Sequence, residues 1–324
     1  MDSSAQSENL VAPFPYFGGK RHAADLVWSL IGEPANYVEP FCGSAAMLLA
    51  APPGKRVETI NDYDCMVSNF WRSIIGDPNG VAYYADFPVS ECDLFARHSW
   101  LVRQSDGLRT ALHDPEYFDC KIAGWWCFGI NNWIGSGWCS GSGPWVWDGE
   151  KIVDNRKLPH LGNAGRGINR KLPHLGDAGR GAFIAEWFNT LYERMRDVRV
   201  ACGDWQRVLK DSVTTRHGLT GIFLDPPYDK GSMDYGAGGM GLGISSAVRE
   251  WCAANGDNAM LRIVLCGHAG EHDDLTSQGW TTHQWAARKG YALTDEAIGN
   301  SASETVWASP HCIAMQETQA RMFA

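Results

Sequence analysis

GIFLDPPY, residues 221–228, is the stretch that decides the fold. A short apolar run from Gly221 to Leu224 leads directly into Asp225, Pro226, Pro227 and Tyr228. Such a run, ended by turn residues, is typical of a buried strand whose carboxyl end carries a loop. A tight turn would account for Asp-Pro, but it gives no reason for a second proline followed by an aromatic residue.

Four other short apolar or β-branched runs also end in Gly, Pro, Asp or Asn, at Tyr37–Glu39, Val57–Ile60, Val198–Cys202 and Arg262–Cys266. Helical stretches are expected between several of the strands, at Arg21–Ile31, Ala45–Ala51, Met66–Ile75 and Phe183–Arg196. Alternating strands and helices predict an open, largely parallel α/β sheet. Ligands of such sheets bind beyond the carboxyl ends of the strands, where the loops just named would lie.

The DPPY residues suit transfer of a group to the amino nitrogen of a nucleobase. The amino group of adenine is a poor nucleophile because its lone pair delocalises into the ring, and acceptors placed on its hydrogens shift electron density back to nitrogen. Asp225 offers a carboxylate and Pro226 a backbone carbonyl, in a turn that the prolines stiffen. Tyr228 offers a ring on which an extruded base can stack. A methyl donor held in line would need positioning and no metal.

The loop after the first predicted strand is suited to a nucleoside cofactor. Gly43 and its small neighbours let a ligand approach the backbone where a helix begins. Asp62 ends the next predicted strand about 20 residues on, a spacing that suits a contact to a ribose diol. A nicotinamide-dependent oxidoreductase would share both features but gives no reason for DPPY.

Two further short motifs are compatible with the same kind of cofactor. YFGGK, residues 16–20, would bring an aromatic face and a cation to a cofactor carboxylate, or it could be an ordinary loop before a helix. Asp204-Trp205 would suit an adenine pocket, with the carboxylate accepting the amino hydrogen and the indole stacking.

The alternation of strands and helices is interrupted between Cys65 and Asp197. Gly124–Gly149 is rich in tryptophan and glycine, which favours a hydrophobic mini-core over a stacking platform. A 14-residue repeat follows, RKLPHLGNAGRGIN (156–169) and RKLPHLGDAGRGAF (170–183), within a chain of net charge −9. It is interpreted either as a duplication tolerated in a surface loop or as a flexible basic arm that tracks phosphates. The candidate DNA contacts are Arg156, Lys157, Arg166, Arg170, Lys171 and Arg180.

YFGGK, VEPFCGSA, a strand ending in Asp62, a long insertion and DPPY, in this order, resemble the Dam-type family of adenine-N6 DNA methyltransferases of bacteria and phages. The resemblance implies an α/β, Rossmann-like, S-adenosylmethionine-dependent methyltransferase sheet with an inserted, mainly helical and loop target-recognition domain. Residues 1–64 and 198–324 would form the catalytic domain, and residues 65–197 the recognition region.

The resemblance also implies the site residues. S-adenosyl-L-methionine would be the cofactor, bound by Tyr16, Gly19, Lys20, Pro40, Phe41, Gly43, Asp62 and Asp204. Asp225, Pro226 and Tyr228 would be catalytic, with no metal. The family's first glycine loop usually reads F-x-G-x-G, whereas this chain reads F-C-G-S-A. The basic repeat is not part of the family's general pattern.

We therefore expect site-specific methylation of adenine N6 in double-stranded DNA, by base flipping and direct in-line transfer, in a restriction-modification setting. Methylation of cytosine N4 or of adenine in RNA remains open, as does a catalytically silent DNA-binding relative. The 5-methylcytosine route would need a Pro-Cys loop, which the sequence lacks. No signal peptide, C-x-x-C pair or apolar run long enough to cross a membrane is evident, which predicts a cytoplasmic location without a membrane or an obligate protein partner.

Overall fold

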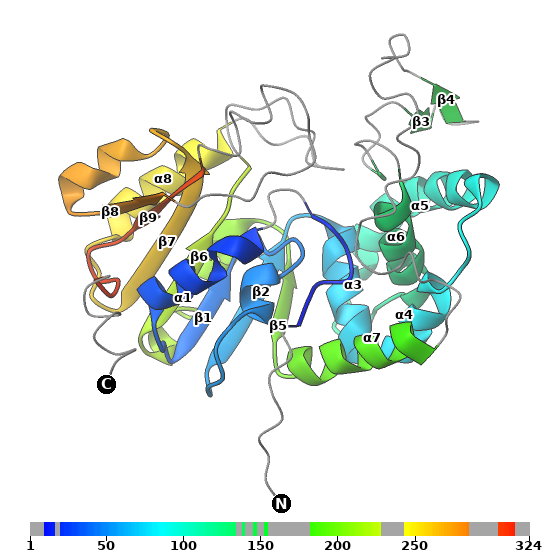
Figure 1. Ribbon diagram of the computed structural model, residues 1–324, viewed down its shortest axis with the longest axis horizontal. Coiled ribbons are helices and arrows are strands. Elements are labelled where there is room, and N and C mark those ends of the chain that lie inside the picture. Colours follow the sequence, from blue (N-terminus) through cyan, green and yellow to red (C-terminus); the bar gives the residue numbers. More distant parts are fainter. Residues whose placement is uncertain are drawn as a thin grey trace, which may run out of the picture.

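A seven-stranded sheet forms the centre of the computed structural model, which describes residues 10–16, 20–133, 138–139, 145–147, 152–154, 182–227, 243–284 and 304–314 (Figure 1). The strand order is β5-β2-β1-β6-β7-β9-β8. The bounds are β1 (Asn36–Glu39), β2 (Val57–Asp62), β5 (Arg199–Cys202), β6 (Thr220–Leu224), β7 (Leu261–His268), β8 (Thr281–Gln284) and β9 (Glu304–Ala308). The predicted α/β sheet is confirmed, and it is compatible with a Rossmann-like methyltransferase fold.

The order of the strands creates a switch point at the centre of the sheet. From β1 the chain moves outward through β2 to β5, and it then returns to place β6 on the other side of β1. These strands and β7 are parallel, whereas β9 is antiparallel to both of its neighbours. In open α/β sheets the ligand crevice lies beyond the carboxyl ends of the strands at such a point, which here means the loops after β1 and β6.

Side chains of the central strands alternate between two apolar layers, as the pleat of a strand requires. Tyr37 and Phe223 belong to the layer covered by η1 (Lys20–Ala23), α1 (Ala24–Ile31) and α2 (Ala46–Leu49). Val38 and Ile222 belong to the opposite layer, with η4 (Trp205–Leu209), α8 (Ile244–Asn255) and η6 (Asp273–Gln278). Both faces of the sheet are therefore buried, which explains the nearly continuous apolar runs in the sequence.

A group of helices lies beside the β5 edge of the sheet (Figure 1). They are α3 (Cys65–Gly76), α4 (Pro78–Ala85), α5 (Glu91–Ala111), α6 (Cys120–Asn132) and α7 (Ala182–Met195). Helix α3 contacts both the sheet, at β2 and β5, and the other helices, at α6 and α7. An antiparallel pair, β3 (Trp145–Trp147) and β4 (Ile152–Asp154), belongs to the same region.

Aspartate side chains mark where several of these helices begin. Asp64 accepts a hydrogen bond from the Met66 amide at the start of α3, and Asp119 does the same for Ile122 in α6. Asp77 ends α3 and caps α4, where Pro78 occupies the first helical position. These residues satisfy amide groups that have no partner inside the helix.

Aromatic side chains form the core of the helical region. Trp126 is buried and meets Phe14 edge-to-face at 4.8 Å between ring centroids, and Phe14 in turn contacts Phe70 at 5.0 Å. The N-terminal segment is tied there by Asn131, whose side-chain amide donates to the Pro13 carbonyl at 2.8 Å. The described tryptophans thus contribute to packing, as the mini-core interpretation predicts.

The structure also contains elements that the sequence patterns did not predict. Helix α8 follows a glycine-rich stretch. Strand β8 is mostly exposed, so its sequence lacks the apolar run that would have marked it as a strand. The first helix begins as a 3-10 turn, and the helix expected at residues 45–51 is reduced to α2. A further 3-10 turn, η5 (Thr215–His217), precedes β6. Within the described ranges no helix is long and apolar enough to cross a membrane.

Candidate active site

Asn61, on β2, joins two loops at the carboxyl edge of the sheet. Its side-chain amide donates to the carbonyls of Pro40 and Gly203, both at 2.9 Å, and its backbone carbonyl accepts from the Cys42 amide at 2.9 Å. The loops after β1 and β5 are therefore connected to β2 through one buried residue. A polar residue inside an apolar strand was the only signal of this role in the sequence.

Asp62 holds the glycine loop in place. One carboxylate oxygen accepts from the Gly43 amide and the other from the Asp64 amide, both at 2.8 Å. Gly43 has a φ of +45°, and a Cβ there would overlap the ring of Tyr16. Only glycine fits both constraints. Burial, followed by the charge of Asp64, raises the pKa of Asp62 to about 7.

Ala45 stands at the position of the second glycine in the pattern F-x-G-x-G, and its backbone is left-handed. Its φ of +50° and ψ of 29° are left-handed, and its side chain is fully buried directly before α2. This conformation costs an alanine about 1–2 kcal/mol relative to the right-handed one. The close turn implied by F-x-G-x-G is therefore retained in F-C-G-S-A.

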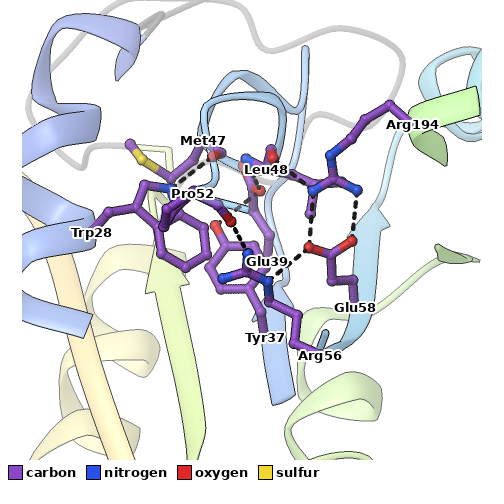
Figure 2. Close-up of polar contacts among 9 residues, drawn as sticks. All are labelled: Trp28, Tyr37, Glu39, Met47, Leu48, Pro52, Arg56, Glu58 and Arg194. Atoms are coloured by element: carbon purple, nitrogen blue, oxygen red, sulfur yellow. Dashed lines mark hydrogen bonds and ion pairs between the residues drawn. The ribbon is translucent and has the colours of Figure 1, made fainter. Parts of the chain in front are cut away.

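Buried side chains hold the short helix α2 in position (Figure 2). The Trp28 indole donates to the Met47 carbonyl at 3.0 Å. Glu39, at the end of β1, accepts from the Leu48 amide at 3.2 Å and from the Tyr37 hydroxyl at 3.0 Å. Burial raises the pKa of Glu39 to about 8, although both hydrogen bonds oppose the shift.

Arg194, at the end of α7, holds the other side of α2 (Figure 2). Its guanidinium donates to the Leu48 carbonyl at 2.9 Å and forms a fork with both oxygens of Glu58 at 2.6 and 2.8 Å. Arg56 also contacts Glu58, at 3.2 Å, and donates to the Pro52 carbonyl. A four-residue helix has little stability of its own, so these contacts fix the position of α2 and of the glycine loop that leads into it.

Lys20 lies beside Asp225 at the carboxyl end of β6. Its ammonium is 3.2 Å from Oδ1 of Asp225 and 3.4 Å from both carboxylate oxygens of Glu304, and the lysine side chain is 4% exposed. Burial alone would lower the pKa of Lys20, but the carboxylates of Asp225 and Glu304 outweigh burial and raise it. The structure thus brings Lys20, expected at the cofactor, together with the candidate catalytic carboxylate.

Asp204 and Trp205 are placed after β5. The Asp204 carboxylate is exposed and accepts from the Gln206 amide at 2.8 Å, which caps η4. Trp205 is buried against Phe41, with ring centroids 6.0 Å apart, and against Trp251. Phe41, half-buried beside Trp205, is the more accessible ring of this pair.

A comparison with known families matches the part of the chain that carries Lys20, Gly43 and Asp62. Residues 16–98 match the family model described as D12 class N6 adenine-specific DNA methyltransferase. This match supports an adenine-N6 DNA methyltransferase family. The resemblance drawn from the sequence motifs is therefore confirmed. The family implies an S-adenosylmethionine-dependent adenine DNA methyltransferase, with S-adenosyl-L-methionine as methyl donor and DNA as substrate. No curated protein matches the chain.

The described residues fit S-adenosyl-L-methionine, the cofactor that the matched family uses. Gly43 lets the Tyr16 ring lie directly against the loop backbone, where a Cβ would collide with it, and Asp62 places a carboxylate, an acceptor for hydroxyl groups, at the end of β2. Tyr16 and Phe41 provide aromatic faces on the two sides of that loop. Pro40 is buried and takes part through its carbonyl, which Asn61 holds.

Several predicted site residues of the methyltransferase lie outside the described residues. Asp225 and Pro226 are described, and Pro226 is buried. Outside the described ranges are Gly19, Tyr228, Arg156, Lys157, Arg166, Arg170, Lys171 and Arg180. The division of the chain at residues 64 and 197 and the individual residue roles therefore stay predictions.

Proposed function

We propose that this adenine methyltransferase acts at a specific site in duplex DNA and turns the target base out of the helix. The position of Asp225 carries the proposal. This residue follows β6 at the switch point of the sheet, and β6 pairs directly with β1, whose loop leads to Gly43. The amino-group acceptor and the cofactor loop thus follow neighbouring strands. A base inside a duplex could not reach this edge, so it would have to be extruded.

The roles of the residues follow from their chemistry. S-adenosyl-L-methionine, when bound, supplies an electrophilic methyl group. Asp62, Gly43 and Phe41 would hold it, because they combine a carboxylate, an accessible backbone and an aromatic face. Asp225 would accept a hydrogen of the adenine amino group and so localise electron density on N6. The rigid Pro226 carbonyl would accept the second hydrogen, and proximity would supply much of the rate.

The inserted region is proposed to bind the DNA. The whole chain carries a net charge of −9, so a local basic patch must steer it toward phosphates. The segment 151–183 has seven basic and two acidic residues and is the densest such candidate in the sequence. Its contacts would position the protein, whereas base contacts would set the recognised sequence.

The biological setting belongs to the same proposal. The motif resemblance is to enzymes of bacteria and phages, so we place the protein in the cytoplasm of a bacterium or of a phage-infected cell. There it would mark DNA as part of a restriction-modification system. No protein partner is needed for the chemistry.

Long-read sequencing of host DNA tests the function directly. The wild-type gene, expressed in a strain without adenine methylation, should produce N6-methyladenine in one short motif. Asp225→Ala should lower turnover by more than about tenfold, or about 1.4 kcal/mol, while leaving cofactor affinity nearly unchanged. Asp211→Asn is the matched control, since Asp211 is exposed on the turn after η4.

Each alternative gives a different outcome. N4-methylcytosine in place of N6-methyladenine would reassign the target base. Methylation of RNA with unmodified DNA would reassign the substrate. If the Asp225→Ala variant keeps wild-type turnover, the amino-group role of this carboxylate is wrong.

A further inference from the structure

Three charged side chains from distant parts of the chain share one end of one sheet face. Glu304 opens β9 on the same side as Val306, which belongs to the layer of Phe223 and Val264. Asp225 continues the alternation of β6 onto that side. Lys20 reaches the same place from η1, which covers this layer, and lies against both carboxylates.

The cluster carries one cation and two carboxylates. Lys20 is almost fully buried, while Asp225 and Glu304 are 17% and 18% exposed. Burial raises the pKa of Glu304, Lys20 opposes that shift, and Asp225 adds to it. Among the described residues, further titratable neighbours are Cys266 and His268 on β7 and Glu39 on β1, which interact electrostatically with Lys20, Glu304 and Asp225 respectively. The ammonium therefore separates two carboxylates that would otherwise repel one another.

We propose that Lys20 and Glu304 are positioning residues for Asp225, and that Glu304 acts through Lys20. Glu304 holds the ammonium on the side of β9, and the ammonium holds Oδ1 of Asp225. The carboxylate thereby keeps one orientation when the adenine amino group arrives. This proposal rests on the catalytic role proposed for Asp225.

The arrangement predicts that the effect of Glu304 on turnover changes sign when Lys20 is removed. Two residues that contributed independently to turnover would not produce this reversal. With Lys20 present, Glu304 anchors the ammonium and supports turnover. Without Lys20, the charge of Glu304 faces Asp225 with no cation between them and opposes turnover. Neutralising Glu304 should therefore harm the wild type and help a protein that lacks Lys20. Interaction energies of this kind are measured by double-mutant cycles.

The experiment compares Glu304→Gln, Lys20→Met and the double variant by steady-state kinetics with duplex DNA. We expect kcat to fall about threefold to tenfold for Glu304→Gln and about a hundredfold for Lys20→Met, within the range that positioning contributes. The KM for S-adenosyl-L-methionine should stay within about twofold of wild type, since only the transition state loses an interaction. The double variant should have a higher kcat than Lys20→Met alone.

An exposed ion pair provides the control cycle. Arg249 and Asp274 lie 3.5 Å apart on α8 and η6, and their side chains, 34% and 62% exposed, are more solvated than those of the cluster. Arg249→Met, Asp274→Asn and their combination should leave kcat unchanged and show no reversal. Thermal melting and calorimetric cofactor binding show whether each variant is folded. If Lys20→Met fails to fold, the kcat of Glu304→Gln decides the outcome, because this substitution is nearly isosteric.

The possible failures are distinguishable. Lys20→Met with a raised KM for cofactor and a normal kcat would place Lys20 at the cofactor and overturn the inference. An unchanged kcat in Glu304→Gln, or a double variant no better than Lys20→Met, would also overturn it. In these cases Asp225→Asn would still be inactive. A fully active Asp225→Asn variant would instead overturn the proposed function.

Discussion

Replacing Arg194 by methionine should weaken cofactor binding although Arg194 lies on α7, outside the glycine loop. The substitution removes the fork to Glu58 and the hydrogen bond to the Leu48 carbonyl, while methionine retains most of the apolar side chain. Leu48 belongs to α2, which directly follows the loop of Gly43 to Ala45. Loss of this contact leaves one side of α2 without its anchor.

The magnitude follows from the burial of the pair. Exposed ion pairs contribute about 0–1 kcal/mol, and breaking a buried pair costs about 3–5 kcal/mol. Arg194 is 22% exposed and Glu58 is 11% exposed. Arg56 stays on Glu58 at 3.2 Å and limits the loss. We therefore expect the free energy of unfolding to fall by about 2–3 kcal/mol, between these two limits, because the Leu48 carbonyl still accepts from the Ala51 amide at 3.1 Å.

Urea unfolding and calorimetry measure the two consequences. The affinity for S-adenosyl-L-methionine should fall about tenfold, which corresponds to about 1.4 kcal/mol. Arg196→Met is the matched control, because Arg196 lies just beyond the end of the same helix and pairs only with exposed Glu193 at 3.1 Å. Its effect on stability should stay below about 0.5 kcal/mol. Equal effects of the two substitutions, or a destabilised Arg194 variant with normal cofactor affinity, would refute the reasoning.

Three further predictions concern the cofactor edge of the sheet. Gly43→Ala should weaken cofactor binding by at least about tenfold, because the added methyl group displaces the Tyr16 ring. The positive φ at this position also strains an alanine by about 1–2 kcal/mol. Calorimetry with the cofactor alone measures the change in affinity. Asp62→Ala should weaken cofactor binding far more than DNA binding, because the Gly43 amide loses its acceptor; filter binding to DNA, unchanged within error, is the comparison. Glu39 has a folded pKa of about 8, above its ordinary 4.5, so its contribution to stability is present below about pH 4.5 and is lost as the pH rises toward 8. Glu39→Gln should consequently gain in Tm relative to wild type between pH 5 and 8, and a difference in Tm that does not change with pH would contradict the assignment.

The sequence predicts the parts of the site that are local. The five parallel strands were found from apolar runs, and Asp225 and Asp62 were placed after β6 and β2 because loops at the carboxyl ends of parallel strands meet at one edge. These features depend on residues close together in the chain.

The parts that escaped prediction depend on contacts between distant segments. Lys20 and Glu304 are 284 positions apart, and no periodicity within either segment reveals their contact. The assignment of Lys20 to a cofactor carboxylate, drawn from the YFGGK motif, stays a prediction. Arg194 belongs to no sequence motif, and only the folded structure shows its bonds to Glu58 on β2 and to the Leu48 carbonyl on α2. Helix α8 was missed because its sequence follows glycines with few large apolar residues.

The helical region lies in the chain between β2 and β5, and this location suggests how the recognised DNA sequence could be altered by grafting. These two strands are hydrogen-bonded neighbours, so the region is one enlarged crossover between adjacent strands. Its first helix, α3, and its last, α7, both contact the sheet or the residues that anchor α2. A graft that keeps α3 and α7 and exchanges the chain between them would leave the contacts of Asn61, Asp62 and Arg194 unbroken. On the proposed role of this region in DNA recognition, exchanging it between relatives, with junctions inside these two helices, would exchange the recognised sequence.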